Sequence, residues 1–281
     1  MNLLEGKCAV VTGSTRGIGR AIAVEFARFG ARVLLNHRPG TGRSEAQARV
    51  SETVEEIRKL QGREPQIFEA DMTREEEVSA LARAAVETLG RLDIWVNNVG
   101  LHLVTPALQL NAEQWEELFR INVTSAFLGC REAAAIMKEQ GSGSIINITS
   151  KMGIVGCAEN SCYCAAKAAV KMMSECLAAE WAASGIRVNA VAPGVTLTEP
   201  TFNVIRGKPE LEAALCYRTP MGRMANPEEI ARAVVFLASD LATYVTGTAL
   251  SCDGGWVGDS DFAGIPPEKL EGWTREFPKN A

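Results

Sequence analysis

The segment Val10–Gly19, with the sequence VVTGSTRGIG, decides the fold class of this 281-residue chain. An apolar run ends in a glycine-rich turn, and a helix is predicted directly after it at Ile18–Phe29. A strand, a tight turn and a helix in this order are typical of the first βα unit of a dinucleotide-binding fold. In the spacing GxxxGxG, Gly13 permits the turn, Gly17 lets the backbone approach a pyrophosphate, and Gly19 lets the helix pack on the strand. Helix N-terminal N–H groups then face the anion.

Apolar, β-branched runs alternate with amphipathic segments along the rest of the chain. We predict strands at Ala9–Thr12, Arg32–Asn36, Pro65–Glu69, Leu92–Asn97, Gly143–Thr149, Ile186–Ala192 and Ala249–Cys252. Further helices are predicted at Arg43–Gln61, Glu75–Leu89, Ala112–Gln140, Cys162–Ser184 and Pro227–Ala238. This alternation predicts an α/β fold with a parallel sheet and helices on both faces. No Pro/Gly/Ser-rich linker divides the chain, so we expect one domain over residues 1–258 and a C-terminal extension over 259–281.

Composition excludes several classes of function. A net charge of −5 argues against a nucleic-acid partner, which would need a basic face. No apolar run approaches the ~18 residues of a membrane span, and the first residues lack the pattern of a signal peptide. Eight cysteines without a CxxC pair indicate free thiols, and two isolated histidines do not indicate a metal site. We therefore expect a cytoplasmic protein that acts on a small molecule.

The end of the second predicted strand bears on the choice of cofactor. An Asp or Glu at this point hydrogen-bonds the ribose 2′-OH of NAD, but this chain has Asn36, His37 and Arg38. Arg16 lies in the glycine-rich turn close to the same place, and two cations near one phosphate favour NADP(H). NAD(H) stays open, because both arginines could also be solvated surface charges.

Tyr163 and Lys167 form a YxxxK pair within a predicted helix. Residues i and i+4 share one helix face, so the phenol and the ammonium can point into one cleft. A phenol with its ordinary pKa of about 10 is a poor base at neutral pH, and a nearby ammonium lowers that pKa. Ser150 ends a buried strand, where its hydroxyl could hydrogen-bond a substrate carbonyl. Asn122 lies inside a predicted helix, where Asn is unfavourable unless it binds the backbone or a water molecule.

Taken together, these motifs make the chain resemble the short-chain dehydrogenase/reductase family in its single-domain form. The resemblance runs from Leu4 to Gly255 and is carried in order by TGxxxGxG at Thr12–Gly19, Asp71, NNxG at Asn97–Gly100, Asn122, Ser150, YxxxK at Tyr163–Lys167, Pro193-Gly194, Gly222-Arg223-Met224, Pro227–Ile230, Gly247 and Asp253–Gly255. It implies a doubly wound Rossmann-type fold with a seven-stranded, mostly parallel sheet.

The resemblance also implies a mechanism in which hydride passes between a nicotinamide and a ketone or secondary alcohol. Tyr163 would exchange a proton with the substrate oxygen, and Ser150 would hold that oxygen. Lys167 would bind the nicotinamide ribose and lower the tyrosine pKa, and Asn122 would support a water in a proton relay. The cofactor-binding set that follows is Gly13, Ser14, Arg16, Gly17, Ile18, Gly19, His37, Arg38, Asp71, Met72, Asn98, Val99, Gly100, Tyr163, Lys167, Pro193, Gly194, Val195 and Thr198.

The chain departs from the family pattern at two places near the expected site. Val99 stands where the family usually has alanine, and Lys151, directly after Ser150, stands where a small residue is more usual. Cys162 and Cys164 flank Tyr163 and are interpreted as packing residues. The substrate pocket is expected to be lined by residues 101–103, residues 151–153, Cys157 and the segment after Thr198, which could be a lid or an ordinary surface helix.

Two alternatives to a ketone or alcohol oxidoreductase of small molecules remain. One is a 3-oxoacyl-acyl-carrier reductase, although residues 180–185 at the end of the catalytic helix carry no cation for an acidic carrier. The other is a catalytically silent dinucleotide-binding regulator, which would have no chemical need for all four catalytic residues. The resemblance implies a homotetramer or homodimer, and the small and apolar residues of Ala112–Gln140 and Cys162–Ser184 would supply an interface.

Overall fold

The central sheet accounts for the architecture. The computed structural model describes residues 2–40 and 43–258, and within them seven strands form one sheet in the order β3-β2-β1-β4-β5-β6-β7. The strands are β1 (Cys8–Val11), β2 (Arg32–His37), β3 (Gln66–Glu69), β4 (Ile94–Asn97), β5 (Gly143–Ile148), β6 (Ile186–Pro193) and β7 (Ala249–Cys252). Each neighbouring pair is parallel, and each strand begins and ends within two residues of its predicted range. The doubly wound α/β fold is confirmed, whereas the extension predicted over 259–281 lies outside the described residues.

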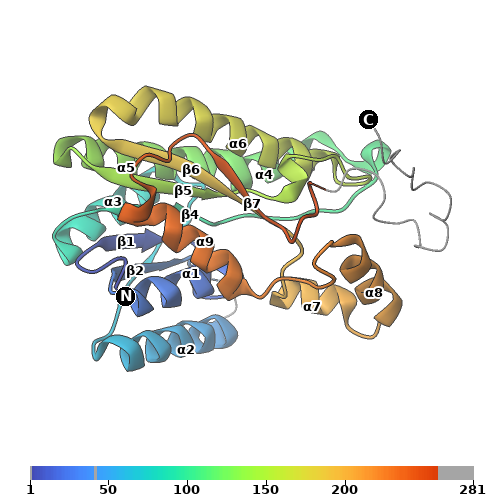
Figure 1. The fold of residues 1–281 in the computed structure, drawn as a ribbon, viewed down its shortest axis with the longest axis horizontal. Helices are drawn as coiled ribbons and strands as arrows, with labels where there is room; N and C mark the ends of the chain where they lie inside the picture. The colour runs from blue at the N-terminus through green and yellow to red at the C-terminus, as the bar shows by residue number, and fades with distance from the viewer. Residues whose placement is uncertain (1, 41–42, 259–281) are drawn as a thin grey trace, which may run out of the picture.

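The helices confirm most of the predicted ranges. They are α1 (Gly17–Arg28), α2 (Arg43–Gln61), α3 (Glu75–Leu89), α4 (Ala112–Phe119), α5 (Ser125–Gln140), α6 (Ser161–Trp181), α7 (Glu199–Ile205), α8 (Pro209–Arg218) and α9 (Pro227–Ala238). The segment after Thr198, left open between a lid and a surface helix, forms α7 and α8. Figure 1 shows this pair set apart from the helices that cover the sheet. None of the described helices is both long enough and apolar enough to cross a membrane.

One predicted helix is interrupted. The range Ala112–Gln140 was expected to be continuous, but it is divided into α4 and α5 by a π-helical segment, Arg120–Thr124. The side chain of Asn122, inside this segment, donates to the backbone oxygens of Leu118 and Leu101. A π-helical turn within an α-helix is frequent at functional sites, and here it carries a residue predicted to be catalytic.

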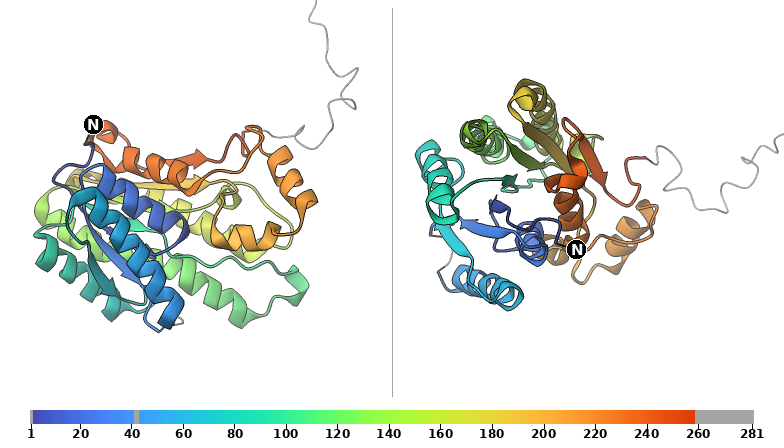
Figure 2. Two further views of the ribbon diagram at one scale, coloured as in Figure 1. Left: turned by 90° about the horizontal axis from the view of Figure 1, so that it is seen from below. Right: turned by 60° about the vertical axis from the view of Figure 1, so that its left-hand side comes forward.

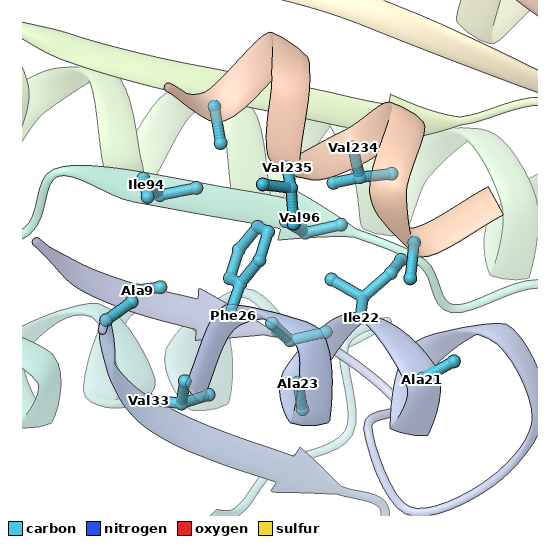
Figure 3. Packing of buried hydrophobic residues seen from close by; sticks show 14 of the residues in the cluster. Ala9, Ala21, Ile22, Ala23, Phe26, Val33, Ile94, Val96, Val234 and Val235 are labelled. Carbon is cyan, nitrogen blue, oxygen red and sulfur yellow. The ribbon is translucent and has the colours of Figure 1, made fainter. Parts of the chain in front are cut away.

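Helices cover both faces of the sheet (Figures 1 and 2). On one face α1 and α9 pack together, and Phe26 of α1 lies between the sheet and α9, near Val96 of β4 and Val235 of α9 (Figure 3). On the other face α3, α5 and α6 bury a second cluster around Trp95, which is fully buried. Burial on both faces explains why inner strands such as β1 and β4 are almost entirely apolar, as expected for parallel sheets between helical layers.

Candidate active site

The glycine-rich turn adopts the backbone that the spacing predicts. Gly13 and Gly17 have φ angles of +60° and +54°, a backbone region that residues other than glycine rarely occupy. A Cβ atom on Gly19 would collide with the Gly13 carbonyl oxygen and with the side-chain nitrogen of Asn98. The turn is therefore built for close approach of backbone, which is what binding a pyrophosphate requires.

The turn is held in place by the NNxG segment after β4. The Asn98 side-chain nitrogen donates to the Thr12 carbonyl oxygen at 2.9 Å, and the Asn98 backbone N–H donates to Thr12 Oγ1 at 2.9 Å. The branched side chain of Val99 packs against Gly13, 3.3 Å from where a Cβ would be. The structure thus brings Gly13, Asn98 and Val99 together, as expected from the sequence.

Two buried polar groups connect the turn to the neighbouring strands. Ser14 is buried, and its hydroxyl accepts from the Asn36 backbone N–H at 2.9 Å. Asn36 is buried as well, its Oδ1 accepting from the Gly13 N–H at 3.2 Å and its side-chain nitrogen donating to the Ala70 oxygen at 3.1 Å. Asn36 is thus used for internal cross-linking. Met72 is buried in the core close by, and Ile18 is partly buried at the start of α1.

The charged residues expected to bind the adenosine half of the dinucleotide lie at the carboxyl ends of β2 and β3. Arg38 Nε is 3.0 Å from Asp71 Oδ2, and His37 Nε2 is 3.7 Å from Glu69 Oε1. Arg38 is exposed, and so is Arg16, the residue that immediately precedes α1. Burial raises the pKa of the Asp71 carboxyl, but hydrogen bonds from Thr73 and the charge of Arg38 outweigh it, so the net pKa is lowered. Asp71 is therefore an anion beside Arg38.

Tyr163 and Lys167 lie on one face of α6, as the YxxxK spacing predicts. Lys167 Nζ is 5.7 Å from the centroid of the Tyr163 ring and donates to the Ile148 oxygen, at the end of β5, at 3.1 Å. Ser150 follows β5 directly, and its hydroxyl accepts from the Met152 N–H at 3.1 Å. The Ser150 side chain lies close enough to the Tyr163 hydroxyl to act on its pKa, which it lowers.

The pKa of Tyr163 differs from our expectation. The Lys167 ammonium was expected to lower it, but burial raises the Tyr163 pKa, and the Ser150 side chain offsets only part of this rise. The same burial lowers the pKa of Lys167 to about 8. Both charged forms lose hydration in this cleft, so the phenolate and the ammonium are each disfavoured in the chain by itself.

Asn122 and Lys167 converge on Gly100. A Cβ on Gly100 would lie 2.9 Å from Asn122 Oδ1 and 3.2 Å from Lys167 Nζ. Asn122 Oδ1 also accepts from the Leu101 backbone N–H at 3.3 Å. The π-helical turn therefore places the Asn122 amide on the side of Gly100 where the lysine ends.

The segment after β6 completes the site. Gly194 donates its N–H to the Cys252 oxygen at 2.9 Å and packs against Asp253, and Val195 accepts from the Ala225 N–H at 2.9 Å. The Thr198 methyl group lies 3.4 Å from where a Cβ on Gly17 would be, so this segment returns to the glycine turn. A cavity of about 740 Å³ between α7 and α8 is lined by Thr198 and by residues of the segment after it, among them Phe202 and Ile205.

Three further side chains, those of His102, Lys151 and Trp256, lie close to the proposed catalytic residues. The His102 ring centroid is 4.5 Å from that of Tyr163, and His102 Nε2 is 2.6 Å from Asn160 Oδ1. Beside Ser150, the buried Lys151 lies against Trp256, which Arg218 also contacts. His102 and Lys151 had been named only as pocket lining, and no local signal joins Trp256 to either because that contact spans a hundred residues.

The cysteines and possible metal ligands play no evident part. All eight cysteines lie within the described ranges and are free thiols, and Cys162 packs with Leu118 and Ala166, as interpreted from the sequence. In the part of the chain that the structure describes, no cluster of three His, Cys, Asp or Glu side chains could hold a metal ion.

Comparison with known proteins identifies the family. A family model described as enoyl-(acyl carrier protein) reductase matches residues 13–257. The chain is 41% identical to 3β-hydroxysteroid dehydrogenase 1 of Eggerthella lenta over 90% of this chain and 94% of that protein, and 38% identical to glucose 1-dehydrogenase 2 of Bacillus subtilis over 90% and 95%.

A solved structure agrees with these relatives. That of a putative NAD(P)-dependent gluconate 5-dehydrogenase from Beutenbergia cavernae, with NADP bound, superposes with a TM-score of 0.82 at 37% identity, covering 92% of this chain and 99% of that one. The ordered motifs, the sheet topology and these similarities agree: the chain belongs to the short-chain dehydrogenase/reductase family of NAD(P)-dependent oxidoreductases.

Proposed function

We propose that this chain interconverts a ketone and a secondary alcohol, with Tyr163 as the general acid and base. The observation that carries the proposal is the arrangement around α6, where the Tyr163 hydroxyl meets Ser150 and the Lys167 ammonium is buried on the same helix face. The nicotinamide supplies or accepts the hydride when it is bound. During reduction Tyr163 donates its proton to the substrate oxygen, and during oxidation it removes that proton, while Ser150 holds the oxygen by a hydrogen bond.

Lys167 and Asn122 serve this proton transfer indirectly. Lys167 holds the ribose next to the nicotinamide, and its ammonium stabilises the phenolate form of Tyr163 when both groups are ionised. Asn122 Oδ1 and Lys167 Nζ both adjoin Gly100, which supports a proton relay to Lys167 through a water molecule held by Asn122.

The dinucleotide fits the residues present. A pyrophosphate needs close approach to backbone N–H groups, and the glycine turn would lose that approach if Gly19 carried a Cβ. We assign the pyrophosphate to Gly13, Ser14, Arg16, Gly17, Ile18 and Gly19. The adenosine half falls to His37, Arg38, Asp71 and Met72. The nicotinamide half falls to Asn98, Val99, Gly100, Tyr163, Lys167, Pro193, Gly194, Val195 and Thr198.

NADP(H) is the proposed cofactor, with NAD(H) as the alternative. At the end of β2 the chain has Asn36, which carries no negative charge to repel a 2′-phosphate. The exposed Arg38 guanidinium lies beside Asp71, where the adenosine half is expected to bind. Arg38→Ala is expected to weaken NADP(H) binding by roughly 1.5–3 kcal/mol, the range for a hydrogen bond to a charged group, and to weaken NAD(H) binding less. Titration calorimetry with both dinucleotides measures the difference.

Arg58→Ala, on the outer helix α2, is the matched control, because Arg58 is exposed and pairs only locally with Glu55. It is expected to leave both affinities unchanged. An equal loss of affinity for the two dinucleotides in Arg38→Ala would show that Arg38 does not bind the 2′-phosphate. A parent protein that prefers NAD(H) would overturn the proposal directly.

The acyl-carrier alternative has one observation in its favour, the description of the matching family model. Against it, the end of α6 presents Glu180, and residues 180–185 contain no cation for an acidic carrier. Assay with a 3-oxoacyl carrier and with free ketones decides between them. No turnover of any ketone or alcohol with either dinucleotide would instead favour the silent regulator.

We also propose an oligomer, a homotetramer or a homodimer, in the cytoplasm. Phe127 on α5 and Met172 on α6 are large apolar side chains with 42% and 55% of their surface exposed, and the small Ala168 on α6 is exposed as well. Exposed apolar helix faces of this kind usually mark an interface, and symmetric pairing gives a two-fold contact. Between α9 and β7, Leu241 and Tyr244 are exposed and support a second contact. Free thiols support the reducing location.

Light scattering is expected to give two or four times the mass of one chain, and the double change Phe127→Glu with Met172→Glu is expected to lower it. The two introduced glutamate carboxylates, on α5 and α6, would lose their hydration in the interface, which costs several kcal/mol for each ion. Lys59→Glu, which changes an exposed residue on α2, is the control and is expected to leave the mass unchanged. A monomeric parent at micromolar concentration would contradict the proposal.

A further inference from the structure

Lys151 is a buried cation beside the proposed oxygen-binding serine. It follows Ser150 directly, and only 5% of its surface is exposed. Among the residues that the structure describes, its ammonium has neither a carboxylate within 4.0 Å nor a hydrogen-bond acceptor. An ammonium taken out of water without such partners costs several kcal/mol. A buried lysine whose charged form lacks acceptors, directly after Ser150, indicates a ligand that supplies them.

The contact that Lys151 does make compensates for only part of this cost. Its Nζ lies 2.6 Å from the centroid of the Trp256 ring, and Arg218 Cζ lies 4.9 Å from the same ring. A cation–π contact contributes roughly 0.5–2 kcal/mol, less than the desolvation of an ammonium, and a ring face accepts at most one of its three N–H donors. Two cations therefore share one indole.

The nearby acid does not balance this charge. Asp253 is buried, but its two carboxylate oxygens accept from the backbone N–H groups of Gly255 and Val257 at 3.0 and 2.9 Å. These bonds fold the turn that carries Trp256. The carboxylate thus shapes the wall on which Lys151 rests, without approaching the ammonium to ion-pair distance.

This wall stands between the proposed catalytic group and the α7–α8 pair. Gly254 packs against Thr219 and Gly255 against Pro220, both in the segment that follows α8. Lys151 reaches the same turn from the end of β5, next to Ser150. Because Lys151 follows Ser150 in the chain, a substrate whose oxygen is held by Ser150 would bind within reach of this lysine side chain.

We propose that Lys151 is a specificity-determining residue that binds a carboxylate of the substrate, so that the enzyme acts on keto acids and the corresponding hydroxy acids. The inference rests on the proposed function and names its substrate class. A carboxylate supplies the acceptors that the ammonium lacks, and its single charge matches the single ammonium that adjoins Ser150.

The titration of Lys151 gives the inference a signature in pH. Burial lowers the pKa of Lys151 to about 7; the charge of Arg218 acts in the same direction, and Cys157 and Asp253 oppose it. Because a neutral amine no longer attracts a carboxylate, the KM for a keto acid is expected to rise as pH increases through about 7 and above. The KM for an uncharged ketone has no such cause to change.

The test compares keto acids with their methyl esters. The probes are 4-oxopentanoate, 5-oxohexanoate and 6-oxoheptanoate, which place the carboxylate at increasing distance from the ketone, each with its methyl ester and NADPH or NADH. For at least one pair the parent is expected to prefer the acid by roughly 10- to 100-fold in kcat/KM, the range for one charge-assisted hydrogen bond. Lys151→Met is expected to abolish this ratio, and Lys151→Arg to retain part of it.

Lys59→Met on α2 is the control lysine, exposed and remote, and is expected to leave the ratio unchanged. Lys151→Gln serves as a second neutral variant if the Met variant does not fold. Turnover of esters and acids at equal kcat/KM in the parent, or an acid preference that survives both neutral variants, overturns the inference while the proposed function stands. Turnover of no ketone, acid or ester overturns the proposed function, and the inference falls with it.

Discussion

Tyr163→Phe is expected to lower kcat by at least about 100-fold, the usual loss when a general acid or base is removed. The substitution deletes only the titrating oxygen. The ring keeps its contact with His102 at 4.5 Å between centroids and its place beside Lys167, so the cleft retains its packing. Dinucleotide affinity is therefore expected to change little, and calorimetry alongside steady-state kinetics separates the two effects.

The pH profile adds a second measurement to the same variant. Because burial raises the pKa of Tyr163, the phenolate that accepts a proton during alcohol oxidation becomes more populated as pH rises. The oxidation rate of the parent is expected to rise with pH, and the Phe variant is expected to lose that rise. Tyr244→Phe, which changes a fully exposed tyrosine, is the control. Near-normal turnover in Tyr163→Phe would show that another group carries the proton.

Lys167→Met is expected to lower kcat/KM roughly 100-fold while making the folded chain more stable near neutral pH. Activity falls because a charge-assisted hydrogen bond of roughly 1.5–3 kcal/mol to the cofactor ribose is lost, together with the cation that favours the phenolate. Stability rises because Met fills the space of the lysine stem without a buried charge. Kinetics and urea unfolding of the same preparation measure both.

The pH dependence of unfolding isolates the lysine. Its pKa is 10.5 for an exposed group and about 8 in the folded chain, so between these values the unfolded chain holds a proton that the folded chain has released. Lys167 therefore contributes a rise of roughly 3 kcal/mol in the free energy of unfolding between pH about 8 and 10.5, in addition to the rise that Lys151 contributes because its pKa is lowered to about 7. Lys167→Met is expected to lose this rise, and Lys171→Met, whose lysine is partly exposed and paired with Glu175, to keep it. A rise of equal size in Lys167→Met would refute the burial of the Lys167 charge as its source.

The sequence was sufficient for the features that local patterns determine. The strand ranges followed from apolar runs. Gly13, Asn98 and Ser150 each follow the carboxyl end of a strand, and in a parallel sheet these ends lie at the same side. The π-helical turn at Asn122 was not predicted; its Asn122 side chain bonds to Leu101 in another segment, a contact that no local pattern shows. The pKa of Tyr163 was predicted in the wrong direction, because the sequence shows a neighbouring charge but not the depth of burial.

The substrate wall shows the same limit. Lys151 was recognised as unusual from its position alone, yet its partner Trp256 lies far along the chain. Side chains brought together by the ends of β5 and β7 have no shared periodicity or motif. Their relation becomes visible only when the sheet order is known.

The place of β1 in the sheet has a consequence for how the protein is made. Of the seven strands, β1 is synthesised before the others, yet it lies between β2 and β4, so one of its edges has no partner until β4 has been synthesised. At 5–20 residues per second, the stretch from Val11 to Ile94 takes roughly 4–17 s to translate. During this interval the apolar edge of the nascent β1–β3 half is open to other chains, and chaperone shielding is most valuable then. The bond from Asn98 to Thr12 closes across this edge, so the glycine turn is complete only after the two halves of the sheet have joined.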